Sequence, residues 1–195
     1  MEYFGVATGL LYLFLEIRQH RAMWVVGLLS SLVYVYVFFV SKAYATMGLN
    51  IYNVLISVYG FWRWSRAGGA AGSADMPEGA IRYRRLTPGR AGVLGAVLAV
   101  TFLLIYYLLD GCTDSPVPLI DAAVTAIGIV ATWMLAARII EHWVFWIAAD
   151  SLSVYMYFRL ALYPTMLLYF CYALLAFAGY YMWKKKGIRT DDGAL

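Results

Sequence analysis

The sequence predicts an all-α integral membrane protein, and its composition is the first observation behind that prediction. Hydrophobic residues make up 64% of the 195 residues, charged residues make up 13%, and the mean hydropathy is +0.72. A soluble domain has about 45–50% apolar and about 25% charged residues. The net charge of +4 does not indicate nucleic-acid binding, because basic residues of membrane proteins gather on one side of the bilayer.

Seven stretches of the chain are apolar enough to cross a bilayer, which requires about 20 residues, with a range of roughly 17–25. The predicted spans cover residues 3–17, 23–41, 44–64, 90–109, 119–137, 142–159 and 162–183. They divide the chain into a first three-helix repeat (1–65), a cytoplasmic arginine-rich linker (66–89), a linker transmembrane helix (90–109), a second three-helix repeat (119–183) and a cytoplasmic tail (184–195).

The distribution of Lys and Arg predicts how these spans are oriented. With the N-terminus outside, the outer segments hold only Lys42 and Arg159 of the 15 basic residues. The inner segments hold Arg18, Arg21, Arg63, Arg66, Arg82, Arg84, Arg85, Arg90, Arg138, Lys184, Lys185, Lys186 and Arg189. The positive-inside rule therefore predicts an external N-terminus and a cytoplasmic C-terminus in the cell inner membrane. Six spans would place the two basic ends on opposite sides, so this distribution also favours seven.

An internal repeat supports the same architecture. A shift of 119 residues overlays the first three predicted spans on the last three without gaps. The matching pairs are Trp24 and Trp143, Tyr36 and Tyr155, Tyr44 and Tyr163, Thr46 and Thr165, Met47 and Met166, Gly60 and Gly179, and Trp64 and Trp183. The two units are separated by an even number of crossings, so they point the same way and form a parallel 3+1+3 repeat. Parallel repeats are one way to build a transporter with a central site.

The candidate functional residues centre on Asp150, a carboxylate in the middle of the sixth predicted span. An ionisable side chain at membrane depth costs roughly 2.5–3.5 kcal/mol on insertion scales and usually marks a substrate or ion pathway. Its counterpart in the first repeat is Ser31, so the two repeats differ at this depth. The alternative is a structural aspartate that a neighbouring hydroxyl or backbone group satisfies.

Five further residues complete the predicted substrate-binding set. Asn50 and Asn53 lie three residues apart on roughly one helix face, and an amide both donates and accepts hydrogen bonds to hydroxyls or a carboxamide. Trp143 and Trp146 precede Asp150 by about two turns and one turn, respectively, and could stack on a flat ring or face a cation. Tyr163, in the seventh predicted span, is the fifth of these further residues. The alternatives are interhelical hydrogen bonds for the asparagines and packing for the tryptophans.

The remaining polar residues predict no further chemistry. Glu16, Asp121, Arg138 and Glu141 are expected at helix ends that reach water. No cluster of His, Cys and carboxylates has metal-ligand spacing, and the two cysteines fall in a loop and in a span. The sequence also has no nucleophile elbow and no phosphate-binding loop. We therefore expect no metal, no cofactor and no enzymatic activity.

Three stretches of the chain carry a family signal. The first stretch covers residues 44–64, with Leu49-Asn50 and Tyr59-Gly60-Phe61-Trp62-Arg63-Trp64. The second begins at Glu141-His142-Trp143 and continues through Trp146 and Asp150 to Tyr163, Tyr169, Gly179 and Trp183. The third begins at Thr113-Asp114-Ser115-Pro116 and continues to Ala131-Thr132-Trp133-Met134-Leu135. Together they resemble the PnuC-type family of nicotinamide riboside transporters. The chain departs from many members at Asn50, where Gln is expected, and at Phe61, where Trp is expected. Some members carry Asn in place of Asp150.

The resemblance implies a fold akin to the sugar-transporting SWEETs and facilitated diffusion of an unphosphorylated vitamin precursor, which phosphorylation in the cytoplasm makes effectively one-way. The sequence thus predicts a uniporter that carries nicotinamide riboside for NAD synthesis. Its partners would be this small molecule and the lipid bilayer, with no nucleic acid, and the resemblance is compatible with a homo-oligomer. The alternatives are thiamine or riboflavin as substrate, an ion-coupled transporter, or a membrane scaffold that does not transport.

Overall fold

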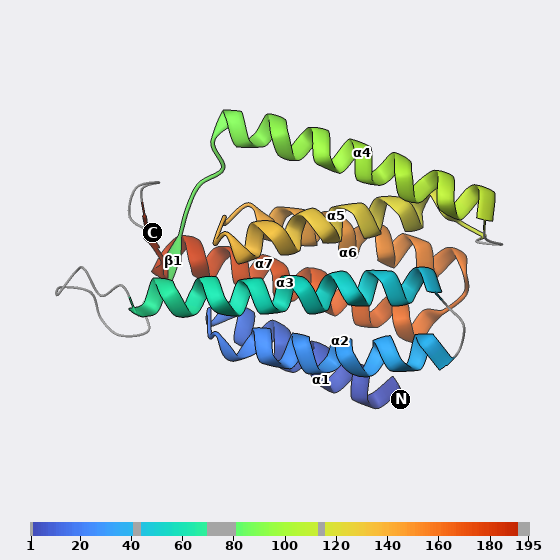
Figure 1. The fold of residues 1–195 in the computed structure, drawn as a ribbon, viewed down its shortest axis with the longest axis horizontal. Coiled ribbons are helices and arrows are strands. Elements are labelled where there is room, and N and C mark those ends of the chain that lie inside the picture. Colours follow the sequence, from blue (N-terminus) through green and yellow to red (C-terminus); the bar gives the residue numbers. More distant parts are fainter. Residues whose placement is uncertain (1, 41–43, 70–80, 113–115, 191–195) are drawn as a thin grey trace. The chain divides into compact units, whose positions relative to one another are not determined.

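The computed structural model describes residues 2–40, 44–69, 81–112 and 116–190, and these form seven helices and one short two-stranded sheet (Figure 1). The helices are α1 (Glu2–Ile17), α2 (Ala22–Val40), α3 (Tyr44–Gly69), α4 (Pro88–Cys112), α5 (Pro118–Ala136), α6 (His142–Arg159) and α7 (Tyr163–Lys186). The strands are β1 (Arg82–Tyr83) and β2 (Ile188–Arg189). Each helix coincides with one predicted span, although α3 and α7 continue into the predicted linker and tail. Residues 70–80 of that linker, 113–115 of the loop before α5 and 191–195 of the tail lie outside the described residues.

The exposed surfaces of the helices are apolar, as a lipid environment requires. Among the described residues of α4, only Leu94 is buried, while Val93, Val100 and Tyr107 are largely exposed. By length and composition, three helices of the described chain could each span a membrane, namely α4, α5 and α7. α1 has only 16 residues, and the polar residues inside α3 and α6 lower the hydropathy of those helices.

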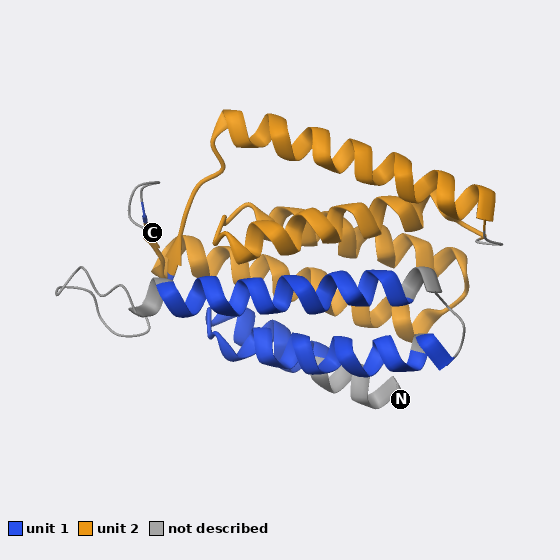
Figure 2. Cartoon of the chain, viewed as in Figure 1, with its two compact units in different colours: residues 1–81, 190–195 blue, residues 82–189 orange. Residues whose placement is uncertain are grey.

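The chain divides into two compact units, which are described separately (Figure 2). Unit 1 comprises residues 1–81 and 190–195 and contains α1, α2 and α3. Unit 2 comprises residues 82–189 and contains α4 to α7 with the β1–β2 sheet. Within each unit, helices that follow one another in sequence pack together. The linker helix α4 thus belongs to unit 2, where it packs on α5.

A tryptophan and a glycine lock the helices of unit 1 together. A Cβ added to Gly60 of α3 would lie 2.5 Å from the ring of Trp24 in α2, so only glycine admits this approach. Trp24 also meets Trp64 edge to face, with ring centroids 5.5 Å apart and an interplanar angle of 90°. All three residues are buried. The contact joins the first turn of α2 to the second half of α3.

Unit 2 contains the same contact 119 residues later. A Cβ added to Gly179 of α7 would lie 2.5 Å from the ring of Trp143 in α6. Trp143 meets Trp183 edge to face, with centroids 5.7 Å apart and an interplanar angle of 84°. The ring of His142 lies 5.0 Å from that of Trp183 and closes the cluster.

The turns that precede these tryptophans also correspond. Gln19 and Arg138, which are 119 residues apart, both have a left-handed backbone, with φ of 53° and 56°. The Gln19 N–H donates to the Glu16 carbonyl at 2.9 Å, and the Arg138 N–H donates to the Leu135 carbonyl at 2.9 Å. Each bond closes the C-terminus of one helix before the chain reverses into the next. The local backbone of the two α–α hairpins is therefore the same.

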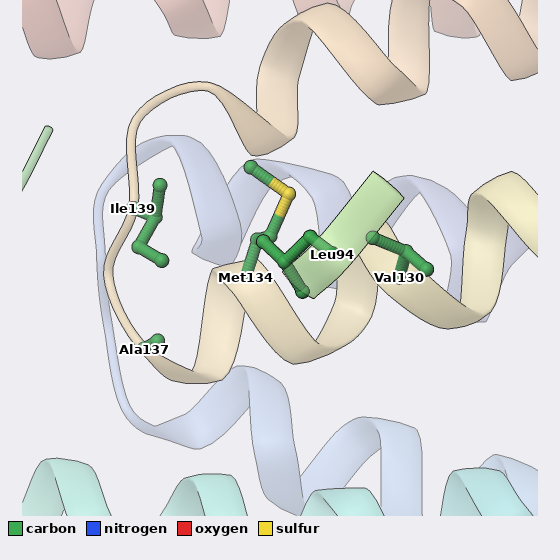
Figure 3. Packing of buried hydrophobic residues seen from close by; sticks show 5 residues of the cluster. All are labelled: Leu94, Val130, Met134, Ala137 and Ile139. Carbon is green, nitrogen blue, oxygen red and sulfur yellow. The ribbon is translucent and has the colours of Figure 1, made fainter. Parts of the chain in front are cut away.

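A small apolar core joins α4 to α5 and to the turn that follows α5. Leu94, Val130, Met134, Ala137 and Ile139 pack against one another, and Figure 3 shows Leu94 beside Met134 and Val130. Leu94 is the single buried residue among those described in α4, so the helix is held to unit 2 along a narrow strip.

The end of the arginine-rich linker is ordered structure, which the sequence did not predict. We call residues 82–87 the strap. Its first two residues pair in parallel with β2, with Arg82 opposite Ile188 and Tyr83 opposite Arg189. The next residue, Arg84, bridges to the α5–α6 turn: its N–H donates to the Arg138 carbonyl at 2.9 Å, and its carbonyl accepts from the Ile140 N–H at 3.0 Å.

Glu141 anchors the other half of the strap. Its carboxylate accepts a hydrogen bond from the Leu86 N–H at 3.0 Å and pairs with the Arg85 guanidinium at 3.1 Å. The hydrogen bond to Glu141 raises the pKa of Arg85 above its ordinary value. Arg138 is buried. The expectation of a solvated helix end was therefore wrong for Arg138, because the strap covers this turn, whereas the Glu141 side chain is partly exposed.

The tryptophan–glycine contact gives a direct stability prediction. Gly179→Ala should lower the free energy of unfolding by about 1–3 kcal/mol, the usual cost of overpacking, because the new methyl group would overlap the Trp143 ring. Thermal unfolding of the purified protein in detergent measures the effect. Gly128→Ala is the matched control, since a Cβ there would lie 3.7 Å from the Trp146 ring, an ordinary contact. Equal melting temperatures for the two variants would contradict the prediction.

Candidate functional site

Asp150 lies in the middle of α6 and is buried, with 7% of its surface exposed. The two hydroxyls nearest to it in sequence are engaged with their own helix. Ser151 donates to the Ile147 carbonyl at 2.7 Å, and Ser153 donates to the Ala149 carbonyl at 2.9 Å. Each hydroxyl has one proton, so neither of them donates to the carboxylate.

Tyrosines of α6 and α7 contact one another, and one of them interacts with the carboxylate. Tyr169 of α7 interacts electrostatically with Asp150 and forms a hydrogen bond with Tyr157 of α6. The Tyr157 and Tyr169 rings are stacked, with centroids 5.1 Å apart and an angle of 26°. Tyr172 meets Tyr169 edge to face at 5.8 Å. We call Asp150, Tyr157, Tyr169 and Tyr172 the acidic–aromatic cluster.

The sequence reasoning missed Tyr169 and Tyr172 as site residues, although the repeat could have identified them. Under the shift of 119 residues, Tyr169 corresponds to Asn50 and Tyr172 corresponds to Asn53. The residues predicted on α3 thus have counterparts on α7, of which Tyr169 interacts with the buried carboxylate and Tyr172 contacts Tyr169. Tyr155, two residues before Tyr157 on α6, is exposed and accepts a hydrogen bond from Arg159.

The two predicted tryptophans of α6 differ in their surroundings. Trp143 is fully buried between Gly179 and Trp183, so its contacts are those of a packing residue. Trp146 is partly exposed and lies against Gly128 of α5. Its buried indole N–H has no hydrogen-bond partner among the described residues. Trp146 is four residues before Asp150, so both side chains project from one face of α6.

Tyr163 lies at the first residue of α7, away from the middle of the helix. It is 56% exposed, and its ring meets Phe158 edge to face at 6.5 Å. Helix α7 begins here because Pro164 occupies a first-turn position, where its missing N–H costs no hydrogen bond. The position suits the entrance of a pathway rather than its centre.

Asn50 and Asn53 lie on α3 in unit 1, and both are partly exposed. Ser57 follows Asn53 by four residues and Asn50 by seven, so the three share one helix face. Ser57 and Ser31 of α2 are buried. This face of unit 1 therefore carries hydroxyls and amides where the corresponding face of unit 2 carries Asp150 and tyrosines.

Glu16 is the second carboxylate that the structure buries. It is 2% exposed at the end of α1, so the expectation that it reaches water was wrong. Tyr12, one turn earlier on α1, interacts electrostatically with Glu16 and with Tyr52 of α3. Glu16 is therefore buried although it lies one residue before the end of α1. Asp121, at the start of α5, is partly exposed.

The acidic–aromatic cluster has the chemistry to bind a cationic or hydroxyl-bearing ring. A buried carboxylate can pair with a positive charge or accept hydrogen bonds from hydroxyls. Aromatic faces attract cations and stack on flat rings. An ionisable residue inside a helical membrane bundle most often lies on a substrate or ion pathway. A helical chain with apolar exposed faces and such a buried residue in one helix is typical of polytopic membrane transporters.

The comparison with known families agrees with this class and narrows it. A family model described as nicotinamide mononucleotide transporter matches residues 1–185. The chain therefore belongs to this family, and the PnuC-type resemblance is confirmed.

Individual relatives are distant but cover nearly the whole chain. A nicotinamide riboside transporter PnuC of Escherichia coli (strain K12) is 20% identical, and the match covers 100% of this chain and 89% of the relative. The PnuC of Neisseria mucosa is 25% identical, covering 93% of this chain and 70% of the relative. A riboflavin/roseoflavin transporter RibM of Streptomyces davaonensis is 26% identical, covering 77% of this chain and 68% of the relative.

One solved structure resembles this fold. It is described as the crystal structure of the vitamin B3 transporter PnuC, with a TM-score of 0.70 and 23% sequence identity over 93% of this chain and 79% of that chain. The similarity shows that the helices follow the same fold.

The stacked tyrosine pair provides a test of the cluster. Tyr169→Phe keeps the ring but removes the hydroxyl that bonds to Tyr157, so the free energy of unfolding should fall by about 0.6 kcal/mol, the average for a hydrogen bond between membrane helices. Tyr169→Leu also removes the stacking and should cost more, by about 0.5–1.5 kcal/mol. Thermal unfolding in detergent measures both, with exposed Tyr36→Phe as the control. An unchanged Tyr169→Leu protein would show that the cluster is not a packed unit.

Proposed function

We propose that the protein is a uniporter that carries nicotinamide riboside, or a closely similar vitamin, into the cytoplasm, where it supplies NAD synthesis. The strongest support is the buried carboxylate of Asp150 in a member of the nicotinamide mononucleotide transporter family. Asp150 interacts with one of two stacked tyrosines and shares a helix face with the indole N–H of Trp146. Nicotinamide riboside combines a flat cationic ring, a carboxamide and ribose hydroxyls. Those are the three features that a carboxylate, aromatic rings and amides recognise.

We further propose that the chain is a parallel 3+1+3 repeat like that of the SWEETs. Support comes from the tryptophan–glycine contact and the left-handed turn residue, both of which recur after 119 residues. The bounds of α1 to α3, shifted by the same number, also agree with those of α5 to α7 to within three residues. The basic residues support an inner-membrane protein with its N-terminus outside and its C-terminus in the cytoplasm.

Each proposed substrate-binding residue has a separate role. Asp150 pairs with the positive ring or the ribose hydroxyls, and Trp146 stacks on the ring. Asn50 and Asn53 bind hydroxyls or the carboxamide, and Tyr163 guides entry. Trp143 stays a proposed contact, but its packing makes Trp146 the stronger candidate.

Other substrates and mechanisms make different predictions. The RibM relative transports riboflavin or roseoflavin by its name, so riboflavin is the first alternative, and thiamine is another cationic vitamin. Coupling to protons or sodium would make transport depend on their gradients. A scaffold without transport activity would not respond to any of these ligands.

A fluorescence titration distinguishes these possibilities. The purified protein in detergent is titrated with nicotinamide riboside, thiamine and riboflavin while tryptophan emission is followed. We expect saturable quenching by nicotinamide riboside, and Trp146→Phe should remove most of it. Trp62→Phe, which changes an exposed tryptophan of α3, is the control. A response to thiamine or riboflavin alone would refute nicotinamide riboside as the substrate, and no response at all would favour a scaffold.

The role of Asp150 can be tested by transport. Asp150→Ala should lower uptake of nicotinamide riboside into proteoliposomes by about tenfold or more, because a hydrogen bond to a charged group is worth about 1.5–3 kcal/mol. Asp150→Asn, which keeps an acceptor oxygen, should lose less. Asp110→Asn at the exposed end of α4 should leave uptake unchanged. Normal uptake by an Asp150→Ala protein of normal abundance would contradict the proposed role.

A further inference from the structure

Unit 1 contains a buried carboxylate that the proposed site does not use. Glu16 is 2% exposed, although Arg18 two residues later is at the surface. It lies at the end of α1 near Arg18 and Arg21, the end that we propose faces the cytoplasm. Burying a carboxylate without a functional reason is unfavourable, since the same position could hold an apolar residue. The surroundings of Glu16 therefore decide what it does.

Polar side chains of α1 and α3 lie close to one another in unit 1, and Glu16 interacts with one of them. Tyr12 of α1 interacts electrostatically with Glu16 and with Tyr52 of α3. A Cβ added to Gly27 of α2 would lie 3.1 Å from the Tyr12 ring and 3.2 Å from the Ser57 hydroxyl oxygen. Tyr12 and Ser57 therefore converge on one point of α2, where glycine leaves room for both. We call Tyr12, Glu16, Tyr52 and Ser57 the inner polar cluster.

The inner polar cluster continues into the proposed substrate-binding face of α3. Ser57 belongs to the cluster and lies one turn from Asn53, which lies one turn from Asn50. Polar side chains thus lie at intervals along unit 1, from the first third of α3 to the end of α1. A stepwise series of polar contacts of this kind suits a hydroxyl-bearing cation that moves along the unit.

The repeat shows that the three-helix fold does not need these polar groups. The residues of unit 2 that correspond to Tyr12, Glu16 and Ser57 are Ala131, Leu135 and Ala176. All three are buried. Unit 2 therefore builds the same hairpin and the same tryptophan–glycine contact with apolar residues at these positions. A purely structural role would predict similar residues in both units, whereas a role in transport accounts for the difference.

We propose that Glu16 is a second binding station for the cationic substrate, at the cytoplasmic end of unit 1, which the substrate occupies before release. The inference rests on the proposed function, since it requires a positively charged substrate. Its carboxylate would pair with the positive ring, and the Tyr12 face would attract the same charge. Glu16 acts after the substrate has bound at Asp150 and the asparagines, so it affects the rate of transport rather than the affinity of first binding.

The test compares four proteins in proteoliposomes and in detergent: wild type, Glu16→Gln, Glu16→Leu and the exposed-carboxylate control Asp110→Asn. Initial uptake of nicotinamide riboside gives the transport rate. Tryptophan quenching gives the dissociation constant, and thermal unfolding gives the stability. We expect both Glu16 variants to transport about tenfold more slowly or worse, the effect of roughly one lost charge-assisted contact. Their dissociation constants should stay within about twofold of the wild type.

The stability measurement separates a binding role from a structural one. Glu16→Leu copies the residue of unit 2, so its melting temperature should equal or exceed that of the wild type while transport is lost. Wild-type transport by either variant would overturn the proposal. So would a lower melting temperature in both variants, or a loss of binding that parallels the loss of transport.

The same experiment distinguishes failure of this proposal from failure of the proposed function. If the wild type carries nicotinamide riboside and Glu16→Gln does so at the same rate, only the second station is refuted. If the wild type carries only neutral riboflavin, both the proposed substrate and a station for a cation are refuted.

Discussion

Close approach of a tryptophan ring to a glycine is the contact on which each unit depends. Trp24 lies against Gly60 in unit 1, and Trp143 lies against Gly179 in unit 2. In a bilayer the hydrophobic effect does not drive helices together, because lipid is as apolar as the side chains. Association then requires tight packing, which a residue without Cβ permits. The large indole ring fills the space and fixes the spacing and rotation of the two helices. The polar residues on the remaining faces are positioned as a result.

The two units place different polar residues on this shared framework. At the depth of Asp150, unit 1 has Ser31, and where unit 2 has Tyr169, unit 1 has Asn50. Near the other end, unit 1 has Glu16. Each unit thus buries one carboxylate, but at positions that do not correspond. The packing contact is kept in both units, while the polar residues have diverged.

The strap adds a constraint that only unit 2 has. Its backbone pairs with the α5–α6 turn and with β2, and Glu141 accepts hydrogen bonds from two of its residues. The exposed Arg85–Glu141 pair contributes little by itself. The backbone hydrogen bonds matter more, because they hold the start of α4, the turn and the end of α7 together. The backbone of these linker arginines therefore closes one end of unit 2.

The sequence by itself determined the seven helices, because hydropathy is a property of local sequence. The repeat and the choice of Asp150 rest on spacing and on an intramembrane charge, and they stay predictions. The sequence could not determine which helix face meets which neighbour. That choice depends on side chains far apart in the chain, and the tertiary structure decided it. Packing placed Trp143 inside the core, brought Tyr169 to Asp150 and buried Glu16 beneath its neighbouring helices. A helix end looks solvated in the sequence, but only the surrounding helices decide whether water reaches it.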